Sequence, residues 1–187
     1  MWSFPLSRKA KERAYRDTGM RLIARLVAQL GLPRWGADVM PTYSAEEVAA
    51  IDSGYASFQR MAGKEGGGAA GSMYFHPDAA TEIRRKIAGD EFMSYADRLC
   101  GFADDLPVDW KLAASAYLKA WAATLEPSAL QNLGELLAKA GYADAARETF
   151  TVILKFPPYA PKVYGKQKDE FVQMIVERAS ESLKELP

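Results

Sequence analysis

The sequence predicts an all-α protein, and two observations carry that prediction. Apolar side chains recur at intervals of three and four residues in segment after segment, which is the spacing of a buried helix face. Most of these segments end at glycine or proline, as at Gly31, Gly141 and Pro157. With 187 residues, 49% of them hydrophobic and 26% charged, the chain can build a core of about seven helices.

The first expected helix covers residues 7–31, where one apolar stripe occupies the second half (Leu22, Ile23, Leu26, Val27 and Leu30). The front of this helix is basic, with seven cationic residues (Arg8, Lys9, Lys11, Arg13, Arg16, Arg21 and Arg25). Two interpretations stay open. The helix docks on the core with a solvated basic end, which the confined stripe favours, or residues 8–25 contact an anionic membrane, nucleic acid or an acidic partner.

Residues 32–43 read as an irregular connection, and Ser44 with Glu47 forms a capping box that starts a second helix ending near Met61. We expect this helix to pack against the first. The glycine-rich residues 63–72 predict a linker between an N-terminal helical extension (1–62) and a helical domain (73–187). Their GxGxxG letters do not predict a nucleotide site, because a helix precedes them rather than a strand.

Three further helices are expected before residue 127. The first starts at an Asp78 cap and ends at Gly89, and the second covers residues 90–105. The third begins after an Asp109 cap and runs to residue 126, with Trp110 and Trp121 at core spacing. Packing is therefore the favoured role of these two tryptophans, whereas Trp35, in a connection, is freer to serve another function.

Residues 127–158 predict an antiparallel helical hairpin with a turn at Gly141. Apolar stripes mark both helices (Leu130, Leu133, Leu136 and Leu137; then Ala146, Phe150, Ile153 and Leu154). Gly134 and Ala146 allow close approach of the helices, and Gly141 permits a left-handed turn. Phe150 is expected to fill the space between this hairpin and the next, and Pro158 ends the unit. One last amphipathic helix is expected over residues 162–186.

The order of small, aromatic and proline residues in 127–158 resembles a tetratricopeptide repeat, a helix–turn–helix unit of about 34 residues. Residues 91–126 resemble a degenerate copy, and the last helix then caps the stack. The resemblance implies a TPR-like superhelix whose concave face is made by the first helix of each hairpin. It places partner-binding residues at Ser128, Gln131, Asn132, Glu135 and Lys139, and, one period later, at Lys162 and Lys166.

Few residues offer chemistry. His76 is the only histidine, Cys100 the only cysteine, and Asp104 and Asp105 are adjacent and so do not face each other on a helix. We read His76 as a surface residue, Cys100 as a small buried hydrophobe and the carboxylates as a solvated helix end. The sequence therefore predicts no catalytic residues, no metal site and no cofactor.

These observations favour a non-catalytic scaffold or adaptor in the cytoplasm that binds a peptide or helix of a partner protein, or associates with itself. The alternative is a peripheral adaptor that contacts an anionic membrane or nucleic acid through residues 8–25. Zero formal net charge makes nucleic acid the less favoured partner. No apolar run is long enough to span a membrane, so only surface contact is expected.

Overall fold

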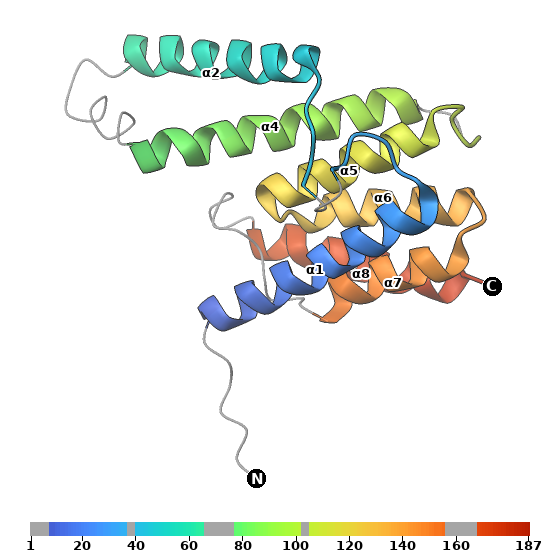
Figure 1. Ribbon diagram of the computed structural model, residues 1–187. Helices are drawn as coiled ribbons and strands as arrows, with labels where there is room; N and C mark the ends of the chain where they lie inside the picture. The colour runs from blue at the N-terminus through green and yellow to red at the C-terminus, as the bar shows by residue number, and fades with distance from the viewer. Residues whose placement is uncertain (1–7, 37–39, 66–76, 102–104, 156–167) are drawn as a thin grey trace.

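The computed structural model describes residues 8–36, 40–65, 77–101, 105–155 and 168–187. Within these ranges it contains seven α-helices and no β-strand, which confirms the all-α class (Figure 1). The helices are α1 (Arg8–Leu30), α2 (Ala45–Glu65), α4 (Pro77–Cys100), α5 (Trp110–Thr124), α6 (Pro127–Lys139), α7 (Ala143–Lys155) and α8 (Lys168–Glu185).

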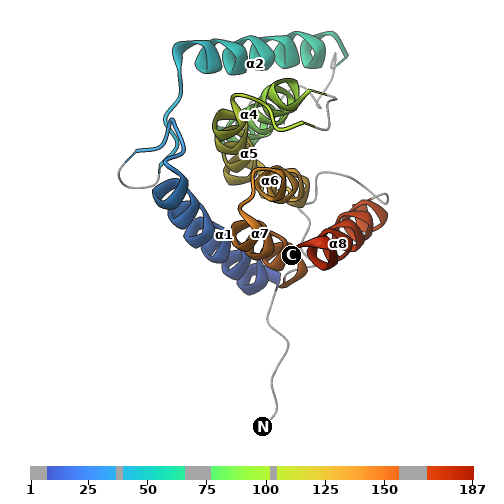
Figure 2. The same cartoon turned by 90° about the vertical axis from the view of Figure 1, so that its right-hand side faces the viewer.

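Two helical hairpins, α4–α5 and α6–α7, form the centre of the molecule, and α5 packs against α6. At one end α2 extends the array by packing on α4, and at the other α8 packs on α6 and α7. Helix α1 packs across α5 and α7. Helices α1 and α8 lie on opposite sides of α7 (Figure 2). The first and the last helix therefore both pack against the central hairpins.

The core is a single cluster that draws on α1, α4, α5, α6, α7 and α8. Nine consecutive residues of α5, Ala113 to Trp121, are buried, because α5 has neighbours on several sides. Trp121 lies at its centre, fully buried, and donates its indole N–H to the Tyr15 hydroxyl at 2.9 Å. Gly19 makes this contact possible, since a Cβ there would lie 2.0 Å from the Trp121 ring.

The α6–α7 hairpin has the packing that its sequence predicts. Leu133, Ala146 and Phe150 are all fully buried. Gly134 faces the Phe150 ring so closely that an added Cβ would lie 2.4 Å from a ring carbon. Gly141 adopts a φ of +81°, which confirms the left-handed turn. Phe150 thus packs across its own hairpin against Gly134.

The prediction of a helix end at Gly89 is wrong, because α4 runs without interruption from Pro77 to Cys100. Gly89 is buried against α5, and a Cβ there would lie 2.3 Å from the Thr124 methyl group. Gly89 therefore allows α4 and α5 to approach closely and does not end a helix. Asp109 does precede α5, but its side chain makes no capping hydrogen bond.

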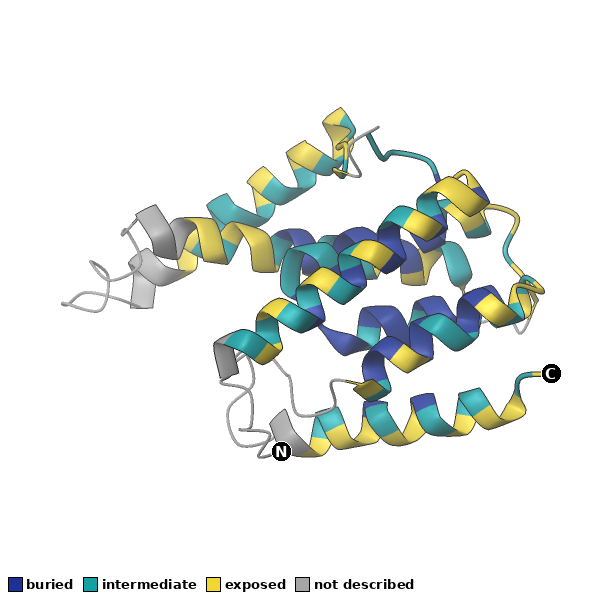
Figure 3. Ribbon diagram, turned by 60° about the horizontal axis from the view of Figure 1, so that its bottom comes forward, coloured by how far each residue is buried: buried dark blue, intermediate teal, exposed yellow. Residues whose placement is uncertain are grey.

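Helix α2 begins at the predicted capping box: the Glu47 amide donates to Ser44 Oγ at 3.2 Å, and the Ser44 amide donates to the Glu47 carboxylate at 2.8 Å. Its expected packing against α1 is not what the structure has, because its main neighbour is α4. Gly54 lets Ile87 approach, and Arg84 pairs with Asp52 at 2.9 Å. No residue of α2 up to Met61 is fully buried, which leaves α2 as the outer edge of the array (Figure 3).

Helix α1 docks on the core, as the first of the two interpretations expects. Leu22, Ile23 and Leu26 are buried, whereas Lys11, Arg13 and Arg21 are exposed. Arg25 pairs with Glu148 of α7 at 2.7 Å. None of the helices in the described ranges is both long and apolar enough to cross a membrane.

Candidate functional site

A groove of about 930 Å³ lies between the C-terminal end of α4, one face of α6 and one residue of α8. Helix α5 contributes one side chain, and Gly101, Asp105 and Pro107, which lie between α4 and α5, add to the lining. We call this hollow the α4–α6–α8 groove. Its walls are Asp97, Arg98, Cys100, Gly101, Asp105, Pro107, Tyr117, Asn132, Glu135, Leu136, Lys139 and Arg178.

Three of the residues that the sequence singles out, Asn132, Glu135 and Lys139, line this groove together. They share one face of α6 because they lie three and four residues apart. Ser128 is half-buried on α6 and is not among the groove-lining residues, and Gln131 is fully buried beneath α8. Lys162 and Lys166 fall outside the described residues.

A network of hydrogen bonds holds α8 to α6 at one side of the groove. Arg178 donates from Nε and Nη2 to the two carboxylate oxygens of Glu135, at 2.6 and 2.8 Å. Gln131 donates from Nε2 to Glu135 at 2.8 Å and to the Ser182 hydroxyl at 3.3 Å. Gln131 therefore positions Glu135 and does not reach the groove surface, which is a different role from the predicted contact with a partner.

The opposite wall is made by Tyr117, Asp97 and Cys100. The Tyr117 hydroxyl donates to Asp97 Oδ1 at 2.7 Å and lies 3.7 Å from Cys100 Sγ. Burial, then the hydrogen bond to Asp97, raises the pKa of Tyr117. Burial likewise raises the pKa of the Cys100 thiol, which is half-buried and not fully buried as expected. Both groups hold their protons at neutral pH.

Asn132 and Lys139 differ from these paired residues. Among the described residues neither makes a hydrogen bond or ion pair, although both line the groove. Glu135, between them on α6, is fully engaged by Arg178 and Gln131. The groove thus presents a free amide and a free ammonium group about two helical turns apart on one wall.

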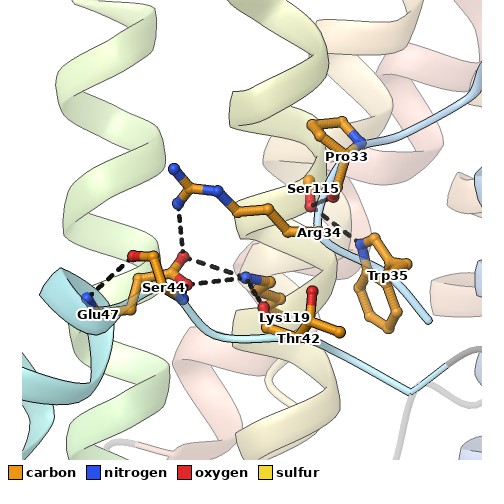
Figure 4. Close-up of polar contacts among 8 residues, drawn as sticks. All are labelled: Pro33, Arg34, Trp35, Thr42, Ser44, Glu47, Ser115 and Lys119. Atoms are coloured by element: carbon orange, nitrogen blue, oxygen red, sulfur yellow. Dashed lines mark hydrogen bonds and ion pairs between the residues drawn. The ribbon is translucent and has the colours of Figure 1, made fainter.

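A second polar cluster lies at the start of α2, where Lys119 of α5 is fully buried (Figure 4). Its ammonium group donates to the Thr42 carbonyl at 2.6 Å and lies 3.1 Å from each carboxylate oxygen of Glu47. The rings of Tyr43 and Phe92, stacked 5.6 Å apart, each have their centre 5.3 Å from Lys119 Nζ. Every donor of the ammonium group has an acceptor or a ring face to meet.

Around Lys119 further hydrogen bonds tie the connection between α1 and α2 to the start of α2 and to α5. Arg34 donates to Glu47 at 3.1 Å, Trp35 donates its indole N–H to Ser115 Oγ at 3.0 Å, and Ser115 donates to the Pro33 carbonyl at 2.6 Å (Figure 4). The sequence left the role of Trp35 open because this residue lies in a loop. In the structure its indole holds the connection to α5. The cluster fastens the N-terminal helices to α5.

Burial lowers the pKa of Lys119, although Glu47 opposes that shift. Burial alone would raise the pKa of Glu47, but the Ser44 amide, Lys119 and Arg34 together lower it below its usual value. Sequence reasoning missed this cluster. The available signal was Lys119 itself, one of two charged residues in an otherwise apolar and small-residue helix.

No group of three or more histidine, cysteine, aspartate or glutamate side chains in the described ranges could hold a metal ion. His76 and Asp104 lie outside those ranges, and Asp105 is exposed at the end of the groove. No protein-family model, curated protein or solved structure matches the chain.

Proposed function

We propose that the chain is a non-catalytic adaptor or scaffold that binds an extended segment of a partner protein in the α4–α6–α8 groove. The observation that carries this proposal is the contrast on α6. Asn132 and Lys139 line the groove without a partner among the described residues, whereas Glu135 between them is paired. An amide that can both donate and accept suits a peptide backbone, and a lysine suits a carbonyl or carboxylate.

We further propose that the helices form a TPR-like stack. The groove lies mainly on α4 and α6, which are the first helices of successive hairpins, and α1 covers the other side of α5 and α7. The close contact of Gly134 with Phe150 supports the same assignment. Helix α4 departs from the repeat pattern in two ways. It is longer than α6, and its second half lacks a Leu-Gly pair.

The titratable groups of the groove support binding rather than catalysis. The raised pKa of Cys100 disfavours the thiolate that a nucleophile needs, and the raised pKa of Tyr117 keeps its hydroxyl protonated. A free thiol of this kind suits the reducing cytoplasm, where we place this activity. Self-association through the same groove is the other form that the interaction can take.

The test is a selection of random displayed peptides against the immobilised full chain, followed by titration of synthetic versions of the enriched peptides. We expect binding to weaken by about 10-fold or more in the Asn132→Ala/Lys139→Ala variant, because hydrogen bonds to charged groups contribute about 1.5–3 kcal/mol. The matched control is Gln29→Ala/Lys11→Ala, which likewise removes one carboxamide and one ammonium group, here from the exposed face of α1.

Selection of peptides whose affinity falls only in the groove variant supports the proposal. Equal affinity for the groove variant and the control would contradict it, as would the absence of any enriched peptide.

A second candidate function, contact of α1 with an anionic membrane or nucleic acid, is favoured by one observation. Lys11, Arg13 and Arg21 are exposed, so they can meet an anionic surface while the apolar side of α1 stays in the core. This contact would be electrostatic only. Vesicles that contain anionic lipid, or a DNA duplex, should bind the wild type at low salt. They should not bind the Lys11→Glu/Arg13→Glu/Arg21→Glu variant. Equal binding of the wild type and this variant would reject the candidate.

A further inference from the structure

Four apolar side chains gather at the end of the molecule where the α4–α5 and α6–α7 turns lie. They are Leu106, Val108, Trp110 and Tyr142, and we call them the turn patch. Val108 is 98% exposed, Leu106 38% and Tyr142 36%. The Trp110 and Tyr142 rings lie 5.4 Å apart and tilted by 37°, which joins the two turns into one surface.

The turn patch adjoins the α4–α6–α8 groove along the chain. Leu106 lies between Asp105 and Pro107 in the chain, and both of these residues line the groove. Val108 follows Pro107 directly. On the other side, Lys139 lines the groove three residues before Tyr142. A segment that leaves the groove at this end therefore meets apolar side chains at once.

We propose that the turn patch receives an apolar side chain of the same partner segment that lies in the groove. This inference rests on the proposed function and adds the chemistry of the partner. The groove walls carry both signs of charge (Asp97, Asp105 and Glu135 against Arg98, Lys139 and Arg178) and so favour no strongly charged segment. The partner is an extended polypeptide with a mixed or neutral polar run and one apolar or aromatic residue beyond it.

Two other occupants fit the turn patch less well. Four side chains fall short of the area, about 800 Å² per partner, that a stable dimer interface buries. The charges around the patch are mixed, Asp105 and Asp109 against Lys111 and Lys139, so it lacks the basic excess that anionic lipid requires. By contrast, one apolar side chain of a peptide can bury enough surface there to change affinity about tenfold or more.

The experiment uses the displayed-peptide selection with the full chain and compares wild type with Leu106→Asp/Val108→Asp. Both residues are exposed, so this turn-patch variant should keep its helical circular-dichroism spectrum and its unfolding midpoint. Val48→Asp, at a 46% exposed position on α2 and outside the groove, is the matched control. We expect enriched peptides to share an apolar residue at a fixed distance from a polar run, and to bind the turn-patch variant at least tenfold more weakly.

A peptide series keeps the result specific. Replacing the shared apolar residue by alanine should weaken binding to the wild type and to Val48→Asp, but not weaken binding to the turn-patch variant further. Enriched peptides without an apolar position, or with equal affinity for the turn-patch variant, would overturn this inference and leave the proposed function standing. A concentration-dependent dimer that Leu106→Asp/Val108→Asp abolishes would also overturn it, because the occupant would be a second copy. If no peptide is enriched, both proposals fail together.

Discussion

Lys119 is the residue whose environment differs most from what its type predicts. A fully buried lysine is costly unless it is paired, and here Glu47, Thr42 and two aromatic rings surround it. The sequence places Lys119 on a predicted helix, but its acceptors, the Thr42 carbonyl and the Glu47 carboxylate, lie more than seventy residues earlier in the chain. A lysine in an otherwise apolar helix signals that a partner is needed, but long-range pairing has no local signature that identifies the partner.

Replacing Lys119 by alanine should therefore destabilise the protein by about 3 kcal/mol, because a partly buried Glu47 carboxylate loses its main counter-charge. Urea unfolding followed by circular dichroism measures the change. The control is Lys111→Ala on the same helix, where the side chain is exposed and a change within about 0.5 kcal/mol is expected. Equal effects of the two substitutions would show that the buried pair contributes little.

Gly134 gives a second prediction at the residue scale. Alanine is the better helix former by about 1 kcal/mol, yet Gly134→Ala should destabilise by about 1–3 kcal/mol, since its methyl group would overlap the Phe150 ring. Combining it with Phe150→Leu should cost less than the sum of the two single changes, because the smaller side chain makes room. Strict additivity in thermal unfolding would contradict the close contact.

Among the elements, the α6–α7 hairpin was the easiest to predict and α4 the hardest. In α6–α7 a strong apolar stripe, a turn glycine and a closing proline all agree. In α4 no single apolar stripe runs along the helix, which packs against both α2 and α5. Gly89 looks like a stop signal although it serves the close crossing with Thr124 of α5.

Helix α1 was predicted as a helix, but its neighbours were not. Leu26 is fully buried in the shared core, so Leu26→Ala should cost about 2–5 kcal/mol of global stability in urea unfolding. The exposed neighbour Ala28→Ser is the control and should change stability little. If Leu26→Ala were also nearly neutral, α1 would be an appended helix rather than part of the core.

For the whole molecule, the sequence predicted the all-α class and placed Asn132, Glu135 and Lys139 on one helix face that the groove contains. It could not predict that α8 covers Gln131, or that Cys100 and Tyr117 form the opposite wall, because these depend on how separate helices pack. The spacing of apolar residues predicts which face of a helix is buried, but it does not predict which other helix covers that face.

Stability of the whole chain should also depend on pH through Glu47. Its pKa in the folded state is below the usual 4.5, so its contribution to folding is complete above that value and is lost as pH falls through the folded-state pKa. Wild type should therefore lose more stability on acidification than Glu47→Gln. Urea unfolding between neutral pH and strong acid measures both slopes, and parallel curves would contradict a lowered pKa.

The most direct test of the central claim is a ¹⁵N chemical-shift map of the full chain titrated with a selected peptide. Binding in the α4–α6–α8 groove predicts shifts at the Asn132 side-chain amide, at Cys100 and Gly101, and at Arg178, with α1 unchanged. Shifts confined to α1 or α2, with those groove signals unmoved at saturation, would contradict it.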